Sequence, residues 1–267
     1  MPARYANYSA IRVGQDGLVL TITLDNPPLN GMTPEAHEEL TRIWADARRR
    51  PRRAGDRLHR RGRARFLRCS GDPKKMIDNW GNRERWHVGI FEARAIIVAM
   101  LECPKPVIAR INGHAMGMGA SLALAADITI AVEDALIGDP HVSVGLAAGD
   151  GGALLWPQLV GLVEARRHLL SGDPLRGKEA AAKGLVTDAV TREELDGAVK
   201  KWVDIFLSKS PSALQTTKQA LNLDILDKAR RHMGEMLRLE TRSWESPNHR
   251  EAVQAMIDKR PPDFVDE

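Results

Sequence analysis

Residues 110–128 combine residue types and a spacing that can bind an oxyanion. An apolar segment runs through a turn containing Gly113, Gly117 and Gly119 into a stretch of small residues that favours a helix. The unpaired amides of a first helical turn, with the positive end of the helix dipole, stabilise a developing negative charge. The segment therefore predicts an oxyanion site, or alternatively a tight strand-to-helix turn that binds nothing.

A second pair of residues, His141 and Asp150, could act as a general base. Asp150 lies nine residues after His141, in the glycine-rich loop 145–152. A carboxylate bonded to one imidazole nitrogen fixes the tautomer and raises the basicity of the other nitrogen. In the alternative interpretation His141 is a core or surface residue, Asp150 caps the helix after Gly152, and Asp139 only supports an Asp-Pro turn.

Strands and helices alternate around these residues, which predicts an α/β fold with right-handed crossover units around parallel strands. We expect strands at 19–24, 107–111 and 128–132, and helices at 34–47, 86–102 and 119–126. Thr33 is the expected N-cap of the first helix. From Arg192 onward the pattern predicts only helices, at 193–209, 212–222, 225–244 and 250–259. We therefore divide the chain into a core, 1–191, and a helical region, 192–267.

Length and composition favour a cytoplasmic enzyme with one large core. The 267 residues are enough to bury such a core, and the two cysteines, Cys69 and Cys103, indicate a reducing compartment. We find no signal peptide and no apolar run approaching the roughly 20 residues that cross a membrane. The cysteines are isolated and the histidines lack ligand spacing, so no metal site is expected.

An arginine-rich segment, residues 48–68, accounts for the basic net charge of the chain. It holds eleven arginines and one aspartate, a local charge of +10, whereas the whole chain carries +4. Arginines at this density do not suit a buried strand, because each buried charge costs several kcal/mol. Our hypothesis is a local shift of reading frame, entering near Arg48 and leaving near Cys69. The alternative is a polybasic RNA-binding arm, which would lack the interleaved aromatic residues that stack on bases, so nucleic acid is not the expected partner.

Four ordered blocks, 70–76, 110–128, 139–152 and 180–187, resemble the enoyl-CoA hydratase/isomerase, or crotonase, superfamily. The resemblance extends from the strand 18–24 to the tail 258–264. It implies a crotonase-like spiral of β-β-α units, whose C-terminal helices cover the active site and build a homotrimer or a dimer of trimers. It implies an acyl-CoA substrate and no separate cofactor.

The resemblance also assigns roles to residues of the first two blocks. The backbone amides of Gly71 and Met118 would bind the thioester oxygen, with Asp72 and Gly117 beside them. Lys74 and Lys75 would lie near the CoA phosphates, or alternatively would be solvated surface lysines. His114 would line the pocket or pack in the turn.

The acid–base residues depart from the hydratase pattern. Hydratases of this family use two glutamates, and the matching positions here hold Ser121 and His141. The pair of His141 and Asp150 resembles instead the His/Asp pair of the β-diketone hydrolases, which cleave a C–C bond by a retro-Claisen route. We expect an enoyl-CoA hydratase/isomerase-like enzyme, with such a C–C hydrolase as the first alternative. The second alternative is a non-catalytic or RNA-binding crotonase-like protein.

Several large side chains fall where the family builds its acyl pocket. These residues are Met76, Trp80, Trp86 and Trp156, and at helical spacing such residues belong to a core more often than to a ligand wall. Glu240, Trp244 and Glu245 fall on a helix that would close the site, and the sequence assigns none of them a role.

Overall fold

The computed structural model describes residues 5–26, 31–48, 73–78 and 80–266, except the side chains of residues 73–75. Apart from Arg48, the arginine-rich segment lies outside the described residues. Both interpretations of that segment therefore stay predictions.

The core is built from repeated β-β-α units. The first unit is β1 (Ile11–Asp16), β2 (Val19–Leu24) and α1 (Pro34–Arg48); the second is β3 (Ile108–Ile111), β4 (Ala115–Met116) and α4 (Met118–Leu124). The third unit is β5 (Ile128–Val132), β6 (Leu136–Gly138) and α5 (Gly152–Ser171), followed by β7 (Leu175–Arg176), α6 (Gly177–Ala182) and β8 (Asp188–Val190). The predicted strands and helices of these units agree with the structure to within a few residues.

In the segments that the structure describes, the strands form three small sheets. Strands β1 and β2 make an antiparallel hairpin, with Ile11 opposite Leu24 and Asp16 opposite Val19. Strands β3, β5 and β8 lie side by side and run parallel, whereas β6 pairs in parallel with β4 and antiparallel with β7. Because β3 leads into β4 and β5 into β6, the loops that follow β4 and β6 emerge next to each other.

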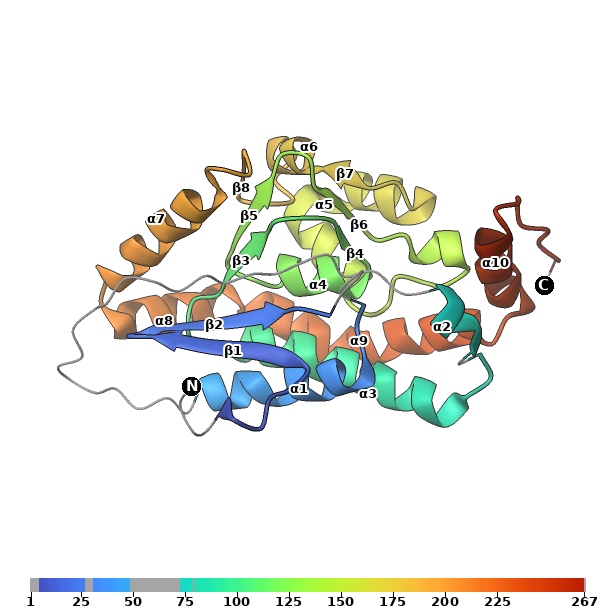
Figure 1. Ribbon diagram of the computed structural model, residues 1–267, viewed down its shortest axis with the longest axis horizontal. Coiled ribbons are helices and arrows are strands. Elements are labelled where there is room, and N and C mark those ends of the chain that lie inside the picture. Colours follow the sequence, from blue (N-terminus) through green and yellow to red (C-terminus); the bar gives the residue numbers. More distant parts are fainter. Residues whose placement is uncertain (1–4, 27–30, 49–72, 79, 267) are drawn as a thin grey trace.

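Helices make up the rest of the described chain. Helices α2 (Pro73–Asp78) and α3 (Arg83–Glu102) precede β3, and α7 (Leu195–Leu207), α8 (Pro211–Leu221), α9 (Leu223–Trp244) and α10 (Pro247–Asp258) follow β8. Ser210 and Ser246 cap α8 and α10, each just before a proline that cannot continue a preceding helix. In the part of the chain that the structure describes, no strand follows β8, as predicted. Figure 1 shows α9 running along the long axis of the molecule, where it packs against both α3 and α5.

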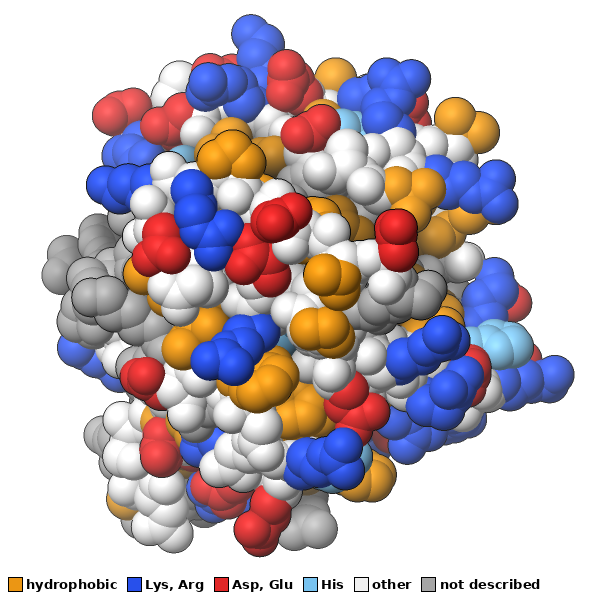
Figure 2. Space-filling view, turned by 90° about the vertical axis from the view of Figure 1, so that its right-hand side faces the viewer, with side chains coloured by type: hydrophobic (Ala, Val, Ile, Leu, Met, Phe, Trp, Pro, Cys, Tyr) orange, Lys and Arg blue, Asp and Glu red, His pale blue; other side chains and the backbone are white. Residues whose placement is uncertain are grey.

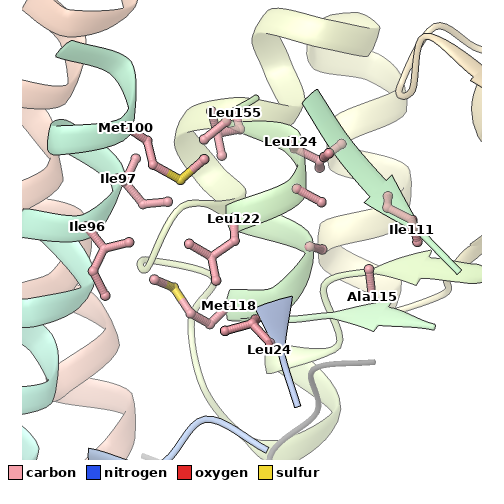
Figure 3. Packing of buried hydrophobic residues seen from close by; sticks show 14 of the residues in the cluster. Leu24, Ile96, Ile97, Met100, Ile111, Ala115, Met118, Leu122, Leu124 and Leu155 are labelled. Atoms are coloured by element: carbon pink, nitrogen blue, oxygen red, sulfur yellow. The ribbon is translucent and has the colours of Figure 1, made fainter. Parts of the chain in front are cut away.

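Helix α4 is held in the centre of the apolar core. Met118 and Leu122 on α4 face Ile96, Ile97 and Met100 on α3 (Figure 3). Each of these five side chains is at most 9% exposed, and burying one such side chain stabilises the fold by about 1.5–3 kcal/mol. The packing therefore fixes the start of α4, where the predicted oxyanion turn lies.

A buried carboxylate joins α1 to the first strand. Glu39, 3% exposed, accepts hydrogen bonds from the backbone N–H groups of Ser9, Ala10 and Ile11 at 2.6, 3.0 and 2.8 Å. Burial opposes ionisation of Glu39, but these donors lower its pKa below the ordinary value. Helix α1 thus anchors the edge of the hairpin through charge-assisted hydrogen bonds.

The surface carries both signs of charge. Figure 2 shows acidic and basic side chains interspersed, with apolar ones among them, on the face at the right-hand end of Figure 1. None of the helices in the described segments has the length and hydropathy needed to span a bilayer.

Candidate active site

The glycine turn forms as the sequence predicts, between β4 and α4. Gly117 adopts φ 55° and ψ −127° and is the N-cap of α4, so Met118 is the first residue of the helix. The N–H of a first helical residue has no acceptor within its own helix. The Met118 amide is therefore available to a ligand, and a side chain at position 117 would be strained.

His141 lies directly against this turn. A Cβ added to Gly117 would lie 3.4 Å from Cε1 and 3.9 Å from Nε2 of His141. His141 begins the short 3₁₀ helix His141–Val144, which follows β6, and β6 pairs with β4. Strand pairing thus brings the imidazole, whose side chain is 13% exposed, to the predicted oxyanion donor.

Two aspartates flank the imidazole, one at each ring nitrogen. Asp139 contacts Nδ1 of His141 through a short hydrogen bond, and its Oδ1 also accepts the His141 backbone N–H at 3.3 Å. Asp150 Oδ2 lies 3.6 Å from Nε2. The structure therefore brings His141 and Asp150 together, but the hydrogen-bonded partner of the ring is Asp139, to which the sequence assigned only a turn.

These carboxylates set the protonation of the site. Burial by itself lowers the pKa of His141, but Asp150 and Asp139 outweigh that effect and raise the pKa well above its ordinary value. Burial raises the pKa of Asp150 to about 6, although the charge of His141 opposes the rise. At neutral pH the resting pair is therefore an imidazolium beside a carboxylate.

Asp150 also contacts Ser121, which stands where hydratases of this family have one of their two glutamates. Ser121 on α4 donates a hydrogen bond from Oγ to Asp150 Oδ1 at 3.4 Å. The N-cap of α5 is Gly151, and no side chain caps it. Asp150 thus faces the histidine and the serine instead of serving as the cap of α5.

A fourth titratable residue, Glu240 of α9, belongs to the same cluster. Its side chain is buried, and it interacts electrostatically with Asp150, His141 and Asp139. The sequence placed Glu240 on a covering helix but gave no reason to select it, because its burial depends on how α9 docks. The only signal was an acidic residue on a helix expected above the site.

The remaining predicted site residues fall into two groups. Gly71 and Asp72 lie outside the described residues, as do the side chains of Lys74 and Lys75 on α2. His114 is described, and its Nδ1 accepts a hydrogen bond from the Leu136 N–H at 2.9 Å. His114 therefore ties the turn before β4 to the start of β6.

A small apolar cluster lies next to His141. It consists of Val144, Leu146, Trp244 and Val253, with Met76, Ile77, Trp86 and Ile257 against it. The rings of Trp86 and Trp244 stack at 4.8 Å, and Trp86 Nε1 donates to Thr241 at 3.0 Å. Trp80 lies under the Arg250 guanidinium, and Trp156 is fully buried in the main core. Of the large side chains that the sequence analysis singled out, Met76, Trp86 and Trp244 thus share this cluster.

The trio of Asp139, His141 and Asp150 is also spaced closely enough to hold a cation, with one ligand atom from each within 4.8 Å of the others. The sequence analysis expected no metal site, because the spacing of Asp139, His141 and Asp150 does not show that the chain between β6 and α5 folds back on itself. Each nitrogen of His141 already faces one carboxylate, so a proton on the ring offsets one of their two negative charges.

A hollow of about 400 Å³ lies elsewhere, between the first turns of α1 and α3. His37, Asn82, Arg85 and Glu92 are among its lining residues. Burial, with the charge of Arg85, lowers the pKa of His37 to about 4, so this ring is neutral at pH 7. None of the acid–base cluster lines the hollow, and we assign it no catalytic role.

Comparison with known proteins agrees with this geometry. Residues 14–267 match the enoyl-CoA hydratase/isomerase family. A probable enoyl-CoA hydratase of Bacillus subtilis is 32% identical over 264 residues, which span 97% of this chain and 100% of that protein. The probable enoyl-CoA hydratase of Rhodobacter capsulatus is 29% identical, with 97% and 99% covered. The crystal structure of an enoyl-CoA hydratase from Mycobacterium avium subsp. paratuberculosis superposes with a TM-score of 0.81 at 25% identity, covering 97% of this chain and 99% of that one.

The chain therefore belongs to the enoyl-CoA hydratase/isomerase family of the crotonase superfamily, and its fold is the crotonase fold. It is an enoyl-CoA hydratase-like enzyme, and the family implies an acyl-CoA substrate. The crotonase fold and the enoyl-CoA hydratase-like function that the sequence predicted are thus confirmed.

Proposed function

We propose that the enzyme hydrates an enoyl-CoA thioester, with the amides of Met118 and Gly71 on the thioester oxygen and the His141–Asp150 pair as the base. The observation that carries this proposal is the position of the His141 ring against Gly117, one residue before the Met118 amide. An oxyanion donor and an acid–base pair whose imidazole lies this close to it can act on one bound acyl group. A preorganised backbone donor of this kind lowers the activation free energy by about 3–4 kcal/mol.

In this mechanism the pair, not the imidazole alone, accepts the proton of water. His141 is protonated at rest, and Asp150, whose pKa is about 6, is ionised at neutral pH. Asp150 accepts the proton while the imidazolium beside it stabilises the charges of the transition state. A carboxylate with a pKa near neutrality is suited to this role, because it stays ionised and is still a useful base.

Retro-Claisen C–C hydrolysis is the alternative reaction, and the replacement of the hydratase glutamate by Ser121 favours it. Ser121 donates a hydrogen bond to Asp150 and cannot itself act as a carboxylate acid. The same His141–Asp150 pair would then direct water to a carbonyl carbon. Incubation in H₂¹⁸O separates the two reactions. Label in a β-hydroxyl group of the product from crotonyl-CoA supports hydration, whereas label only in the carboxylate of a cleaved β-diketone supports the alternative.

The assigned base is tested by replacing His141. We expect His141→Ala to lower kcat by about 10²–10⁴-fold while acyl-CoA affinity stays near that of the wild type, because general acid–base groups contribute this much. Removal of the imidazolium leaves two buried carboxylates without their partner, so the melting temperature should fall as well, and circular dichroism checks that the variant is folded. The exposed His232→Ala on α9 is the matched control. Full activity of His141→Ala would remove the pair from the mechanism.

The alternative from another functional class is a non-catalytic, RNA-binding protein. This alternative depends on the arginine-rich segment. Binding of RNA through phosphates weakens steeply as salt is added. RNA binding that is strong and salt-sensitive, in a protein that turns over no acyl-CoA, would support that reading against ours.

We also propose that the protein assembles as a homotrimer or a dimer of trimers in the cytoplasm. Support comes from α5, where Leu159, Leu162, Val163 and Leu170 are 40–74% exposed, since exposed apolar side chains on one element often mark an interface. Sedimentation equilibrium tests the assembly, and a monomer at micromolar concentration would contradict it.

A further inference from the structure

Glu240 is a buried carboxyl group with an uncommitted oxygen. The residue is only 4% exposed, and its Oε2 has no hydrogen-bond partner among the residues that the structure describes. Other acidic residues of α9 differ, since Glu235 and Asp227 are exposed and pair with arginines on the same helix. An ionised carboxylate in such a place would cost several kcal/mol. Glu240 therefore does not have the role of an exposed acidic residue, which keeps the surface of a protein soluble.

Helix α9 presses Glu240 onto the catalytic loop. A Cβ added to Gly149 would lie 2.8 Å from Oε2 of Glu240 and 2.5 Å from the carbonyl oxygen of Met236. The loop backbone next to Asp150 therefore contacts the helix directly, and no larger residue fits at Gly149. The charged and titratable groups that face Glu240 are Asp150 and Asp139, which disfavour its ionisation, and His141, which favours it.

Hydration needs two proton transfers, one from water to a base and one to the α carbon of the thioester. In the described cluster Asp139 is bonded to His141, and Asp150 faces His141 and accepts from Ser121. Asp139 Oδ2 also lacks a hydrogen-bond partner among the described residues, but the other oxygen of that carboxylate already contacts both the backbone N–H and the ring of His141. Glu240 is left as the carboxyl group with an oxygen free to exchange a proton.

On the basis of the proposed hydration, we propose that Glu240 is the second proton-transfer group of this site. Its carboxylic acid gives a proton to the α carbon, while the His141–Asp150 pair takes a proton from the water whose hydroxyl bonds to the β carbon. The electrons of the broken C=C π bond form the new bond to the α-proton. The pair then returns its proton to Glu240, so that one water molecule is consumed and both groups are restored.

The electrostatics of the cluster agree with this role. Burial, reinforced by the charge of Asp150, raises the pKa of Glu240 well above its ordinary range. The buried site therefore favours the protonated form of Glu240 over the carboxylate, as a proton donor requires. The C-terminal helical region would in this way replace the carboxyl group that the chain lacks at position 121.

Two measurements on Glu240→Gln test the proposal, with the exposed Glu235→Gln on the same helix as the matched control. The amide has the shape of the acid but cannot give up a proton in catalysis. With crotonyl-CoA we expect kcat to fall by about 10²–10⁴-fold with KM within threefold, and Glu235→Gln to behave as the wild type. Infrared spectra at pH 8 should show the carbonyl band of a buried carboxylic acid in the wild type and in Glu235→Gln but not in Glu240→Gln.

The outcomes separate this inference from the proposed function. An active wild type whose kcat is unchanged by Glu240→Gln overturns the role of Glu240 and leaves hydration in place. A wild type without the carboxylic-acid band overturns it too, even where the Gln variant fails to fold. A wild type that turns over none of the enoyl thioesters overturns the proposed hydration, and with it proton transfer by Glu240, whatever the infrared band shows.

Discussion

Replacement of Asp139 by asparagine tests the least expected contact of the site. The carboxylate is 1% exposed and accepts a hydrogen bond from Nδ1 of His141, a charge-assisted bond between buried groups. Such bonds contribute about 1.5–3 kcal/mol, and each 1.36 kcal/mol in a barrier is a factor of ten in rate. We therefore expect Asp139→Asn to lower kcat/KM by about 10- to 150-fold.

The pH dependence gives a second, independent readout for the same variant. Asp139 raises the pKa of Asp150, which is about 6, and activity is expected to fall below that pH as Asp150 is protonated. Removal of the Asp139 charge lowers the pKa of Asp150, so the acid limb of the kcat/KM profile should move to lower pH. Steady-state rates with crotonyl-CoA between pH 5 and pH 9 measure both effects.

The control for this experiment is Asp134→Asn. Asp134 is 70% exposed and contacts Arg192 at the surface, where an ion pair contributes little. Circular dichroism and thermal unfolding show whether each variant keeps its fold. Wild-type activity with an unmoved acid limb in Asp139→Asn would refute our reasoning and return Asp139 to the structural turn that the sequence suggested.

Two further predictions concern the turn and the anchor of α1. Gly117→Ala should lower stability by about 1–3 kcal/mol and reduce kcat, because alanine is strained at φ 55° and relief of that strain would move the Met118 amide; Gly197→Ala, in open space on α7, should be neutral or stabilising in the same thermal and kinetic assays. Glu39→Gln should lower the free energy of unfolding in urea by about 1.5–3 kcal/mol at pH 7, and the exposed Glu38→Gln should change it little. Since the folded-state pKa of Glu39 is depressed, its contribution is present above the unfolded value of about 4.3 and is lost as pH falls through the folded value. A difference between wild type and Glu39→Gln that stayed constant down to pH 2 would contradict this.

The sequence predicted the elements around the site because local chemistry decides them. The helix that begins at Met118 follows glycine, and Pro104 and Pro106 end the preceding helix at Glu102. Such signals depend on residues close together in the chain. The adjacency of His141 and Asp150 was also predictable, because both belong to one recognisable loop.

The identity of the histidine's partner was not predictable from spacing. Asp139 reaches Nδ1 only because His141 opens a 3₁₀ turn directly after β6, and an Asp-Pro sequence is equally common in plain turns. Glu240 is a stronger case, since it lies 90 residues beyond Asp150 and is buried by the docking of α9. Local pattern carries no information on such a contact.

The proposed catalytic residues come from three stretches of chain, around Gly117, around His141 and around Glu240, and the last of these lies on α9, the helix before the last one described. If the strands and α4 reach their native arrangement before α9 docks, the acid–base cluster at that stage lacks Glu240. During refolding, enzymatic turnover should then recover later than the circular dichroism signal of the strands. The delay is the time that α9 needs to dock. Ribosomal synthesis would impose the same order, so a nascent chain gains chemical competence only near the end of its translation.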